Sequence, residues 1–206
     1  MDDRFFMARA IELARIPLHT SPNPRVGAVV VRDGEVIGEG YHFGAGRPHA
    51  ETEALRGVDD ARGATVYVNL EPCMHRAETP PCAPALVEAG VARVVAALED
   101  PDERVRGRGF EYLREHGVEV TGGVMAAEAR ALNAAFIHQR TTGRPLVTLK
   151  LALTIDGRLA ASDGTSRWVT GPEARAVVHR RRAETDAILV GSGTVLADDP
   201  SLTARD

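Results

Sequence analysis

The clearest indication of the fold comes from two short segments: residues 48–51, Pro-His-Ala-Glu, and residues 71–82, Glu-Pro-Cys-Met-His-Arg-Ala-Glu-Thr-Pro-Pro-Cys. Together they contain both cysteines of the chain, Cys73 and Cys82, and a histidine, His49, that Glu51 follows two positions later. One imidazole and two thiolates suit Zn²⁺ in a tetrahedral site, and three protein ligands leave the fourth position open for water. We therefore predict an open, catalytic zinc site formed by His49, Cys73 and Cys82.

The same pattern indicates a reaction. A histidine, a glutamate two residues later and a Pro-Cys with a second cysteine downstream are typical of zinc deaminases, in which the glutamate moves protons without binding the metal. Glu51 is predicted to take a proton from the activated water and to return it to the departing nitrogen. Eight residues separate Cys73 from Cys82, against two in the nucleic-acid base deaminases. We expect this longer loop to overhang the site and to contact substrate.

Other interpretations of these residues remain open at this point. The cysteines could form a disulfide or be two unrelated buried thiols. His75, inside the loop, is a rival ligand, although a fourth protein ligand would close the site and make the zinc structural. A non-catalytic zinc module that only binds a partner is a further alternative. The presence of Glu51 argues against it, because structural zinc needs no proton shuttle.

Composition favours a small-molecule substrate in the cytoplasm. The chain has 206 residues, 44% of them hydrophobic, a net charge of −4 and a pI near 6.0, which is far from the basic character of a nucleic-acid binder. No apolar run approaches the length of a membrane span, and the first four residues, Met-Asp-Asp-Arg, are acidic where a signal peptide is basic. A reducing compartment favours metal-bound thiols over a disulfide. We expect neither a membrane nor a nucleic-acid partner.

The hydrophobic pattern predicts alternating strands and helices. Strands are expected at residues 26–32 and 35–43, around an Asp-Gly hairpin turn, and at 64–70, 91–98 and 118–121. Helices are expected at residues 5–16, 49–56, 80–90, 109–116 and 125–139. This order predicts a three-layer α/β/α sandwich with a mixed sheet.

A linker-like run at residues 141–145, Thr-Thr-Gly-Arg-Pro, is followed by a restart of the pattern. Strands are expected there at residues 146–153 and 187–190, with a helix at 172–182. We therefore predict two domains, at residues 1–144 and 145–206. So few elements would not bury a core of their own.

Two polar residues upstream are candidates for a substrate pocket. Asn23 lies between two prolines in a loop that cannot be regular structure, where it either faces a ligand or serves as an ordinary turn residue. His42 ends the predicted hairpin, where it either faces the pocket or is solvated.

Several motifs resemble those of a known family, the bifunctional riboflavin biosynthesis deaminase/reductases. Its deaminase half is matched by Thr-Ser-Pro-Asn-Pro at residues 20–24, His-Ala-Glu at 49–51, Glu-Pro-Cys-Met-His at 71–75 and Thr-Pro-Pro-Cys at 79–82. The start of its reductase half is matched by Lys-Leu-Ala-Leu-Thr-Ile-Asp-Gly-Arg at 150–158, Ser-Arg-Trp-Val-Thr at 166–170 and Thr-Val-Leu-Ala-Asp-Asp-Pro-Ser-Leu-Thr at 194–203.

The resemblance implies a cytidine-deaminase-like domain followed by the start of a dihydrofolate-reductase-like α/β domain. The implied deamination converts 2,5-diamino-6-(5-phosphoribosylamino)-4(3H)-pyrimidinone to 5-amino-6-(5-phosphoribosylamino)uracil and ammonia. The family then reduces the ribosyl group with NADPH. For this chain we expect Zn²⁺ as the cofactor, and NADPH only where a complete reductase domain is present.

The resemblance also assigns roles by position. In the deaminase domain the matching substrate positions are Asn23, His42, Arg76 and Glu78. In the second domain the cofactor positions are Ala152, Trp168, Thr194 and Asp198, and the substrate positions are Ser166, Arg182, Leu202 and Arg205.

The loop departs from the family pattern in two places. Ala77 replaces a glycine, and Glu78 replaces a basic residue that suits a substrate phosphate. Either Arg76 takes over that role, or the chain acts on another pyrimidine without a phosphate. A nucleoside or tRNA-base deaminase is the enzymatic alternative, against which the acidic chain and the long loop argue. A homo-oligomer is left open.

Overall fold

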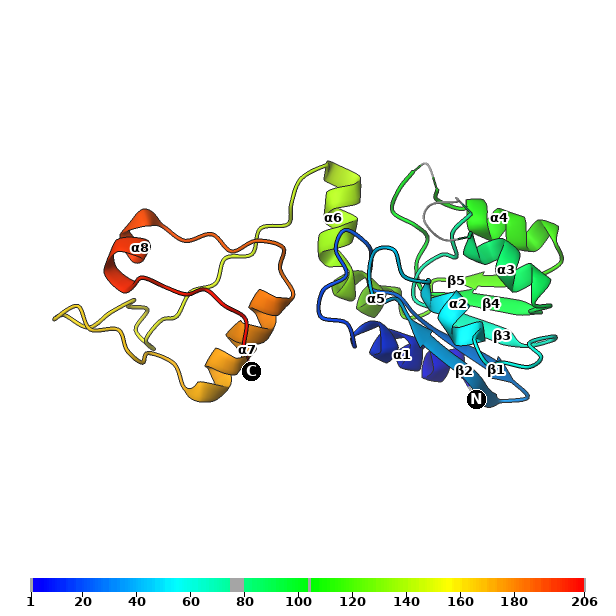
Figure 1. The fold of residues 1–206 in the computed structure, drawn as a ribbon, viewed down its shortest axis with the longest axis horizontal. Helices are drawn as coiled ribbons and strands as arrows, with labels where there is room; N and C mark the ends of the chain where they lie inside the picture. The colour runs from blue at the N-terminus through cyan, green and yellow to red at the C-terminus, as the bar shows by residue number, and fades with distance from the viewer. Residues whose placement is uncertain (1, 75–79, 104, 206) are drawn as a thin grey trace. The chain divides into compact units, whose positions relative to one another are not determined.

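The computed structural model describes residues 2–74, 80–103 and 105–205. The chain divides into two compact units, Met1–Leu146 and Val147–Asp206 (Figure 1). The first unit contains the sheet and the cysteine-containing segments, and it is described first.

Five strands form one mixed sheet in the order β2-β1-β3-β4-β5. Their bounds are β1 (Gly27–Arg32), β2 (Glu35–Tyr41), β3 (Thr65–Val68), β4 (Arg93–Ala96) and β5 (Glu119–Gly122). β1 runs antiparallel to β2 and β3, whereas β3, β4 and β5 are parallel to one another. The predicted Asp-Gly turn joins β1 to β2, with φ of 54° at Asp33 and 81° at Gly34, as a primed hairpin turn requires. The mixed sheet is therefore confirmed.

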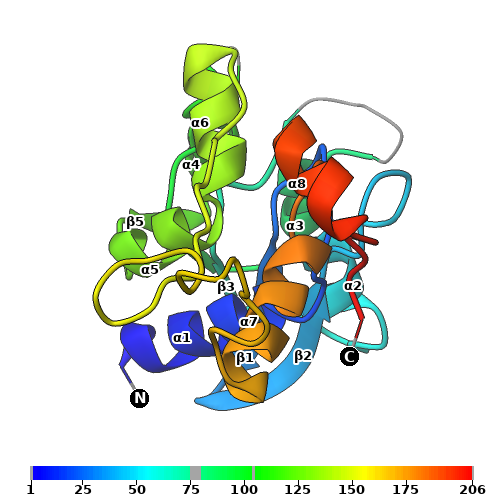
Figure 2. The same ribbon diagram turned by 90° about the vertical axis from the view of Figure 1, so that its left-hand side faces the viewer.

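Helices cover both faces of this sheet (Figure 2). α1 (Asp3–Ala14) lies against β1 and β3, and α5 (Ala126–Leu132) is tied to it by Arg4 and Glu128, whose charged atoms are 3.8 Å apart. On the other face α2 (Ala50–Leu55) packs on β2 and β1 and contacts α3 (Cys82–Glu88), which in turn contacts α4 (Arg108–Glu115). The predicted three-layer arrangement is confirmed.

The core lies on both faces of the central strands. β1, β3 and β4 are almost continuously buried, and most of their buried residues are valines. Strands with both faces covered are expected to be apolar throughout instead of alternating. The edges β2 and β5 are more exposed.

The helix predicted over residues 125–139 is wrong in its continuity. The structure has two helices, α5 and α6 (Ala134–Thr142), separated at Asn133, whose φ and ψ are −103° and 22°. The side chain of Asn133 is buried and hydrogen-bonded to the backbone of Arg25, 108 residues away in sequence. This tertiary contact breaks the helix, which local periodicity does not reveal.

The second unit contains the helices α7 (Pro172–Ala183) and α8 (Ser192–Asp198). The strands predicted at residues 146–153 and 187–190 are wrong, because no strand occurs among the described residues of this unit. A strand needs a neighbour to pair its backbone groups, and here the apolar side chains stay exposed, with Val147 at 84% and Leu149 at 80%. None of the unit's described residues is buried.

No helix formed by the described residues is long and apolar enough to cross a membrane.

Candidate metal centre

The three predicted ligands lie together. The Nδ1 atom of His49 is 3.2 Å from the sulfur of Cys82 and 3.4 Å from that of Cys73, and all three ligand atoms lie within 4.8 Å of one another. Bonds of about 2.3 Å to sulfur and about 2.0–2.1 Å to nitrogen at a tetrahedral zinc would place nitrogen and sulfur about 3.6 Å apart. The donor set and its spacing therefore fit zinc. Both thiols are free, so a disulfide does not form.

One loop and two helix starts bring these atoms together. His49 is the N-cap of α2, and Cys82 is the first residue of α3. Cys73 lies on the loop that follows β3, and its sulfur accepts a hydrogen bond from the Cys82 backbone N–H at 3.4 Å. The Cys73 carbonyl also accepts from the N–H of Ala83 at 3.1 Å. The start of α3 therefore holds the Cys73 loop in place.

Glu71 holds the same loop in place through hydrogen bonds, a role that the sequence does not predict. Its buried carboxylate accepts hydrogen bonds from four backbone N–H groups, on Asp100, Gly107, Gly109 and Phe110, at 2.8–3.4 Å. A Cβ on Gly109 would lie 2.0 Å from the carbonyl oxygen of Pro72, so only glycine permits this approach. A sequence signal existed, because an acid precedes Pro-Cys and two glycines flank the start of α4.

The two thiols have opposite pKa shifts. A hydrogen bond from the Cys82 thiol, followed by one with His49, lowers the pKa of Cys73 to about 4. The Cys73 thiolate and burial together raise the pKa of Cys82. The Cys73 thiolate also raises the pKa of His49. A divalent cation at this position would favour deprotonation of all three groups, since metal ligands bind in that form.

Glu51 lies in the first turn of α2 and is only 4% exposed. Burial, reinforced by the charge of Cys73, raises the pKa of Glu51 to about 7. Its carboxyl group interacts with the thiol of Cys82, which places it against the ligand cluster. A carboxyl group that titrates near neutral pH is suited both to accept and to donate a proton.

Asn23 and His42 lie beside the cluster and bind each other. The Asn23 side-chain nitrogen is 2.9 Å from Nε2 of His42, and Nδ1 of His42 is 2.9 Å from the carbonyl oxygen of Pro48. A carbonyl oxygen only accepts, so Nδ1 carries the proton and Nε2 accepts from the Asn23 amide. Burial lowers the pKa of His42, which favours this neutral form. The ring of His42 also meets that of His49 edge to face at 5.2 Å.

Four loop residues of interest, His75, Arg76, Ala77 and Glu78, lie outside the described residues.

The residues singled out in the second unit are spread over it. Arg182 donates a hydrogen bond to the carbonyl of Thr203 at 3.2 Å, which brings it to the segment that contains Leu202 and Arg205. Thr194 and Asp198 are one turn apart on α8. Trp168 is 72% exposed and stacks under Arg175 at 4.3 Å. Ala152 and Ser166 lie in the irregular segments before α7.

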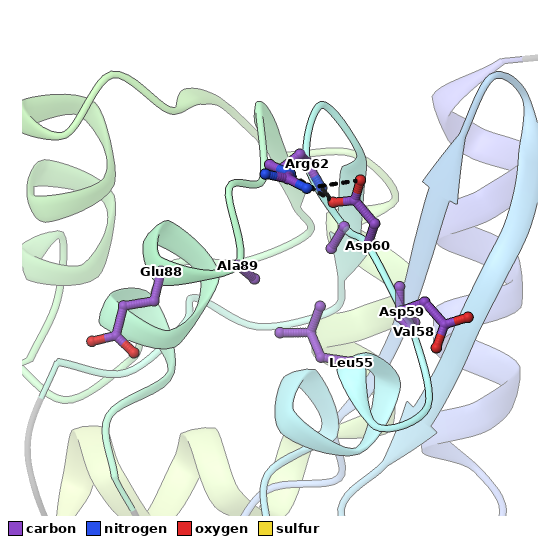
Figure 3. Close-up of a pocket in the computed structure, with 8 residues that line it drawn as sticks. Leu55, Val58, Asp59, Asp60, Arg62, Glu88 and Ala89 are labelled. Carbon is purple, nitrogen blue, oxygen red and sulfur yellow. Dashed lines mark hydrogen bonds and ion pairs between the residues drawn. The ribbon is translucent and has the colours of Figure 1, made fainter.

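A surface pocket lies at the C-terminal ends of α2 and α3, the helices whose starts contribute His49 and Cys82 (Figure 3). It is lined by the C-terminal ends of α2 and α3 and by residues 58–62, and its Arg62 pairs with Asp60 at 3.0 Å. His49 and Cys82 lie at the N-terminal starts of these helices, so this pocket is not part of the metal centre.

Comparison with known proteins agrees with this geometry. Residues 1–98 match the family described as "Cytidine and deoxycytidylate deaminase zinc-binding region", and residues 145–206 match "RibD C-terminal domain". Riboflavin biosynthesis protein RibD of Escherichia coli (strain K12) is 53% identical over all of this chain, which covers 56% of that protein. The chain is homologous to RibD along its whole length.

Solved structures of RibD relatives have the same fold. Acinetobacter baumannii RibD matches 99% of the chain with a TM-score of 0.93 and 48% identity, and the match covers 58% of that chain. A Thermotoga maritima relative matches 98% with a TM-score of 0.94 and 47% identity, covering 59% of its own chain. This chain thus spans somewhat more than half the length of the RibD relatives that it matches.

Proposed function

We propose that residues 1–144 form a zinc-dependent deaminase domain and that residues 145–206 are part of a reductase domain. The proposed reaction is hydrolytic deamination of 2,5-diamino-6-(5-phosphoribosylamino)-4(3H)-pyrimidinone to 5-amino-6-(5-phosphoribosylamino)uracil and ammonia. The observation that carries the proposal is the buried carboxyl of Glu51 against the cluster of His49, Cys73 and Cys82. A purely structural zinc site has no use for a buried carboxyl that titrates near neutrality.

The roles of the side chains follow from their positions. His49, Cys73 and Cys82 hold the metal, which when bound supplies the Lewis acidity that activates water. Glu51 accepts a proton from that water and passes it to the amino nitrogen that leaves as ammonia. Its burial excludes bulk water from the exchange. Asn23 orients the pyrimidine, and the hydrogen bond from its amide to His42 holds the Asn23 side chain in one orientation.

The substrate assignment is supported by the homology to RibD. The Thermotoga maritima relative is titled a diaminohydroxyphosphoribosylaminopyrimidine deaminase/5-amino-6-(5-phosphoribosylamino)uracil reductase. Glu78 favours a second candidate, an unphosphorylated pyrimidine, because an acid in the family's basic position repels a phosphate. The ratio of kcat/KM for the phosphorylated and dephosphorylated substrates decides between the two candidates.

We propose reduction by NADPH only for a complete reductase domain. In such a domain the residues at the cofactor would be Ala152, Trp168, Thr194 and Asp198, and those at the sugar would be Ser166, Arg182, Leu202 and Arg205. We further propose a cytoplasmic location, which the two free thiols support. The oligomeric state is a matter for measurement of mass in solution.

The deciding experiment uses the purified, zinc-loaded chain and the diaminopyrimidinone phosphate. We expect about one zinc per chain and stoichiometric release of ammonia, with activity lost on chelation and restored by zinc. Full activity in a metal-free preparation would contradict the zinc mechanism. A zinc-loaded chain that releases no ammonia from either form of the pyrimidine would contradict the deaminase assignment.

A further inference from the structure

The chain contains three asparagines, Asn23, Asn69 and Asn133, and all three gather around one short segment. Asn69 and Asn133 are 0% and 3% exposed, although asparagine is mostly a surface residue. Burying an amide is costly unless its hydrogen bonds are made. The partners of these two amides therefore indicate what they are there to hold.

Both buried amides bind the backbone of residues 25–27. Asn133 accepts from the N–H of Arg25 at 2.8 Å and donates to the Arg25 carbonyl at 2.9 Å. Asn69 donates to the same carbonyl at 3.0 Å and accepts from the N–H of Gly27 at 2.8 Å. Arg25 precedes β1, so these side chains take the place of a neighbouring strand. Its carbonyl has two lone pairs, enough to accept both amides.

The backbone held by Asn69 and Asn133, residues 25–27, lies immediately after the loop that contains Asn23. Only Pro24, whose ring restricts φ, separates Asn23 from Arg25. At the other end of the loop Thr20 is buried, and it donates to the Asn23 carbonyl at 2.9 Å while its own carbonyl accepts from the Asn23 N–H at 2.9 Å. Between these two anchors the Asn23 side chain reaches His42, whose backbone N–H is bound by the Val26 carbonyl at 2.9 Å.

We infer that Asn69 and Asn133 are positioning residues for the deamination: they hold the Arg25 backbone and thereby set the Asn23 side chain where the pyrimidine binds. This inference rests on the proposed function. Neither amide touches substrate, and each acts through Asn23. The interruption between α5 and α6 lies at Asn133, the residue that makes these hydrogen bonds to Arg25.

The test compares the zinc-loaded chain of 206 residues with its Asn133→Ala variant. We expect zinc content to be unchanged, KM to rise roughly tenfold and kcat to fall less. The reason is that a shift of the Asn23 side chain weakens substrate binding more than it slows the chemical step. Amide hydrogen exchange at Arg25 should become faster, because its N–H loses the Asn133 acceptor. In the double variant Asn23→Ala/Asn133→Ala, KM should stay within about twofold of that of Asn23→Ala alone, since residues that act as a unit are not additive.

Ile137→Ala is the matched control. Ile137 lies on α6 and packs against the core, so its truncation should lower Tm while KM stays at the wild-type value. Asn133→Asp is the milder second variant, for use if Asn133→Ala does not fold. It keeps the acceptor for the Arg25 N–H and loses the donor to the Arg25 carbonyl, and KM should rise in the same direction.

The outcomes separate the inference from the proposed function. An active wild-type chain whose Asn133 variants keep the wild-type KM would overturn the inference alone, as would a double variant whose losses simply add. A wild-type chain that releases no ammonia would refute the function. In that case the exchange rate at Arg25 still tests whether Asn133 holds this backbone, and unchanged exchange there would disprove it.

Discussion

Two buried glutamates lie close to the metal centre, and their surroundings give them different roles. Glu71 is met by four backbone N–H groups, which hold a carboxylate in one orientation. Burial raises the pKa of Glu51 to about 7, which leaves its proton available for transfer. Glu71 thus acts as an anchor for its loop, and in the deamination that we propose Glu51 would be the proton shuttle.

Glu51→Gln should keep zinc and lose deamination. Gln preserves the shape of the side chain but cannot carry the proton, so we expect kcat to fall by roughly 10²–10⁴-fold. Metal analysis and an ammonia assay on the same preparation measure both effects. Activity within a few-fold of wild type would rule out Glu51 as the proton carrier.

Glu71→Gln should weaken the loop that contains Cys73. The amide nitrogen of Gln would face backbone N–H groups that need an acceptor, and leaving them unpaired costs about 1–3 kcal/mol. We expect a lower urea midpoint in the metal-free chain and faster loss of zinc to a chelator. Glu88→Gln, at an exposed position on α3, is the matched control and should change neither. Equal behaviour of the two variants would contradict the anchoring role.

At the scale of elements, the position of α2 depends on its close approach to β2. A Cβ on Gly40 would lie 2.3 Å from the backbone nitrogen of Ala54 and 2.5 Å from the carbonyl oxygen of Ala50. Both are backbone atoms, so relief requires movement of the helix. The N-terminal end of α2 contains the two residues on which the proposed chemistry depends most, the N-cap His49 and Glu51 in the first turn.

Gly40→Ala should therefore impair both stability and activity. Overpacking of this kind costs about 1–3 kcal/mol, and a displaced α2 moves Glu51 relative to the metal ligands, which lowers kcat/KM. Thermal unfolding and steady-state kinetics measure the two effects. Gly122→Ala is the control in the same sheet, because the nearest atom to its added Cβ is 3.9 Å away. A wild-type kcat/KM in Gly40→Ala would show that α2 is not held this way.

An ion pair fastens α1 to the sheet. Arg93 of β4 binds both carboxylate oxygens of Asp3 at 2.8 Å, and Tyr67 of β3 donates to the same carboxylate at 2.9 Å. Both charged side chains are less than one-third exposed. The hydrogen bonds with Arg93 lower the pKa of Asp3 below its usual value of 3.8. Because the pKa of Asp3 is lower in the folded chain than in the unfolded chain, its contribution to the free energy of unfolding is fully present at neutral pH.

Asp3→Asn should thus lower stability in a pH-dependent way. We expect a loss of about 1–2 kcal/mol at pH 7, where the lost hydrogen bonds involve charged groups at a partly exposed site. The difference from wild type should shrink as the pH falls below about 4 and through the lower folded-state pKa, because wild-type Asp3 becomes protonated there. Urea unfolding at a series of pH values measures it. A difference that is independent of pH would point to lost packing instead of lost charge.

At the scale of the whole molecule, the two units differ in what they bury. The first has a sheet covered on both faces, whereas none of the described residues 147–205 is buried. Nucleotide sites are assembled at the ends of several strands, and the described residues of this unit form no strand. The exposed row of Val147, Leu149, Leu151 and Leu153 has the alternation of a strand without a neighbour to pair with.

We therefore predict that the 206-residue chain does not bind NADPH measurably. Calorimetric titration at neutral pH should give no heat of binding up to millimolar cofactor. The matching control is a RibD relative of full length, which should bind under the same conditions. Micromolar affinity in the 206-residue chain would contradict this prediction and support the bifunctional interpretation.

The sequence alone was enough to predict the sheet, the three layers and a set of candidate zinc ligands. These signals are local: Asp33-Gly34 demands a hairpin turn, buried strands are runs of valine, and His-x-Glu with Pro-Cys restricts the metal ligands to a few side chains. Patterns of this kind follow from backbone geometry and ligand chemistry, and therefore they can be recognised without knowing what lies nearby.

The sequence alone could not predict the break at Asn133, the four donors around Glu71 or the absence of the predicted strands from the described part of the second unit. Each depends on a partner distant in sequence, such as the Arg25 backbone for Asn133, or on a neighbouring strand. Hydrogen bonds and strand pairs are made between two groups, and the sequence of one group does not reveal where the other will lie.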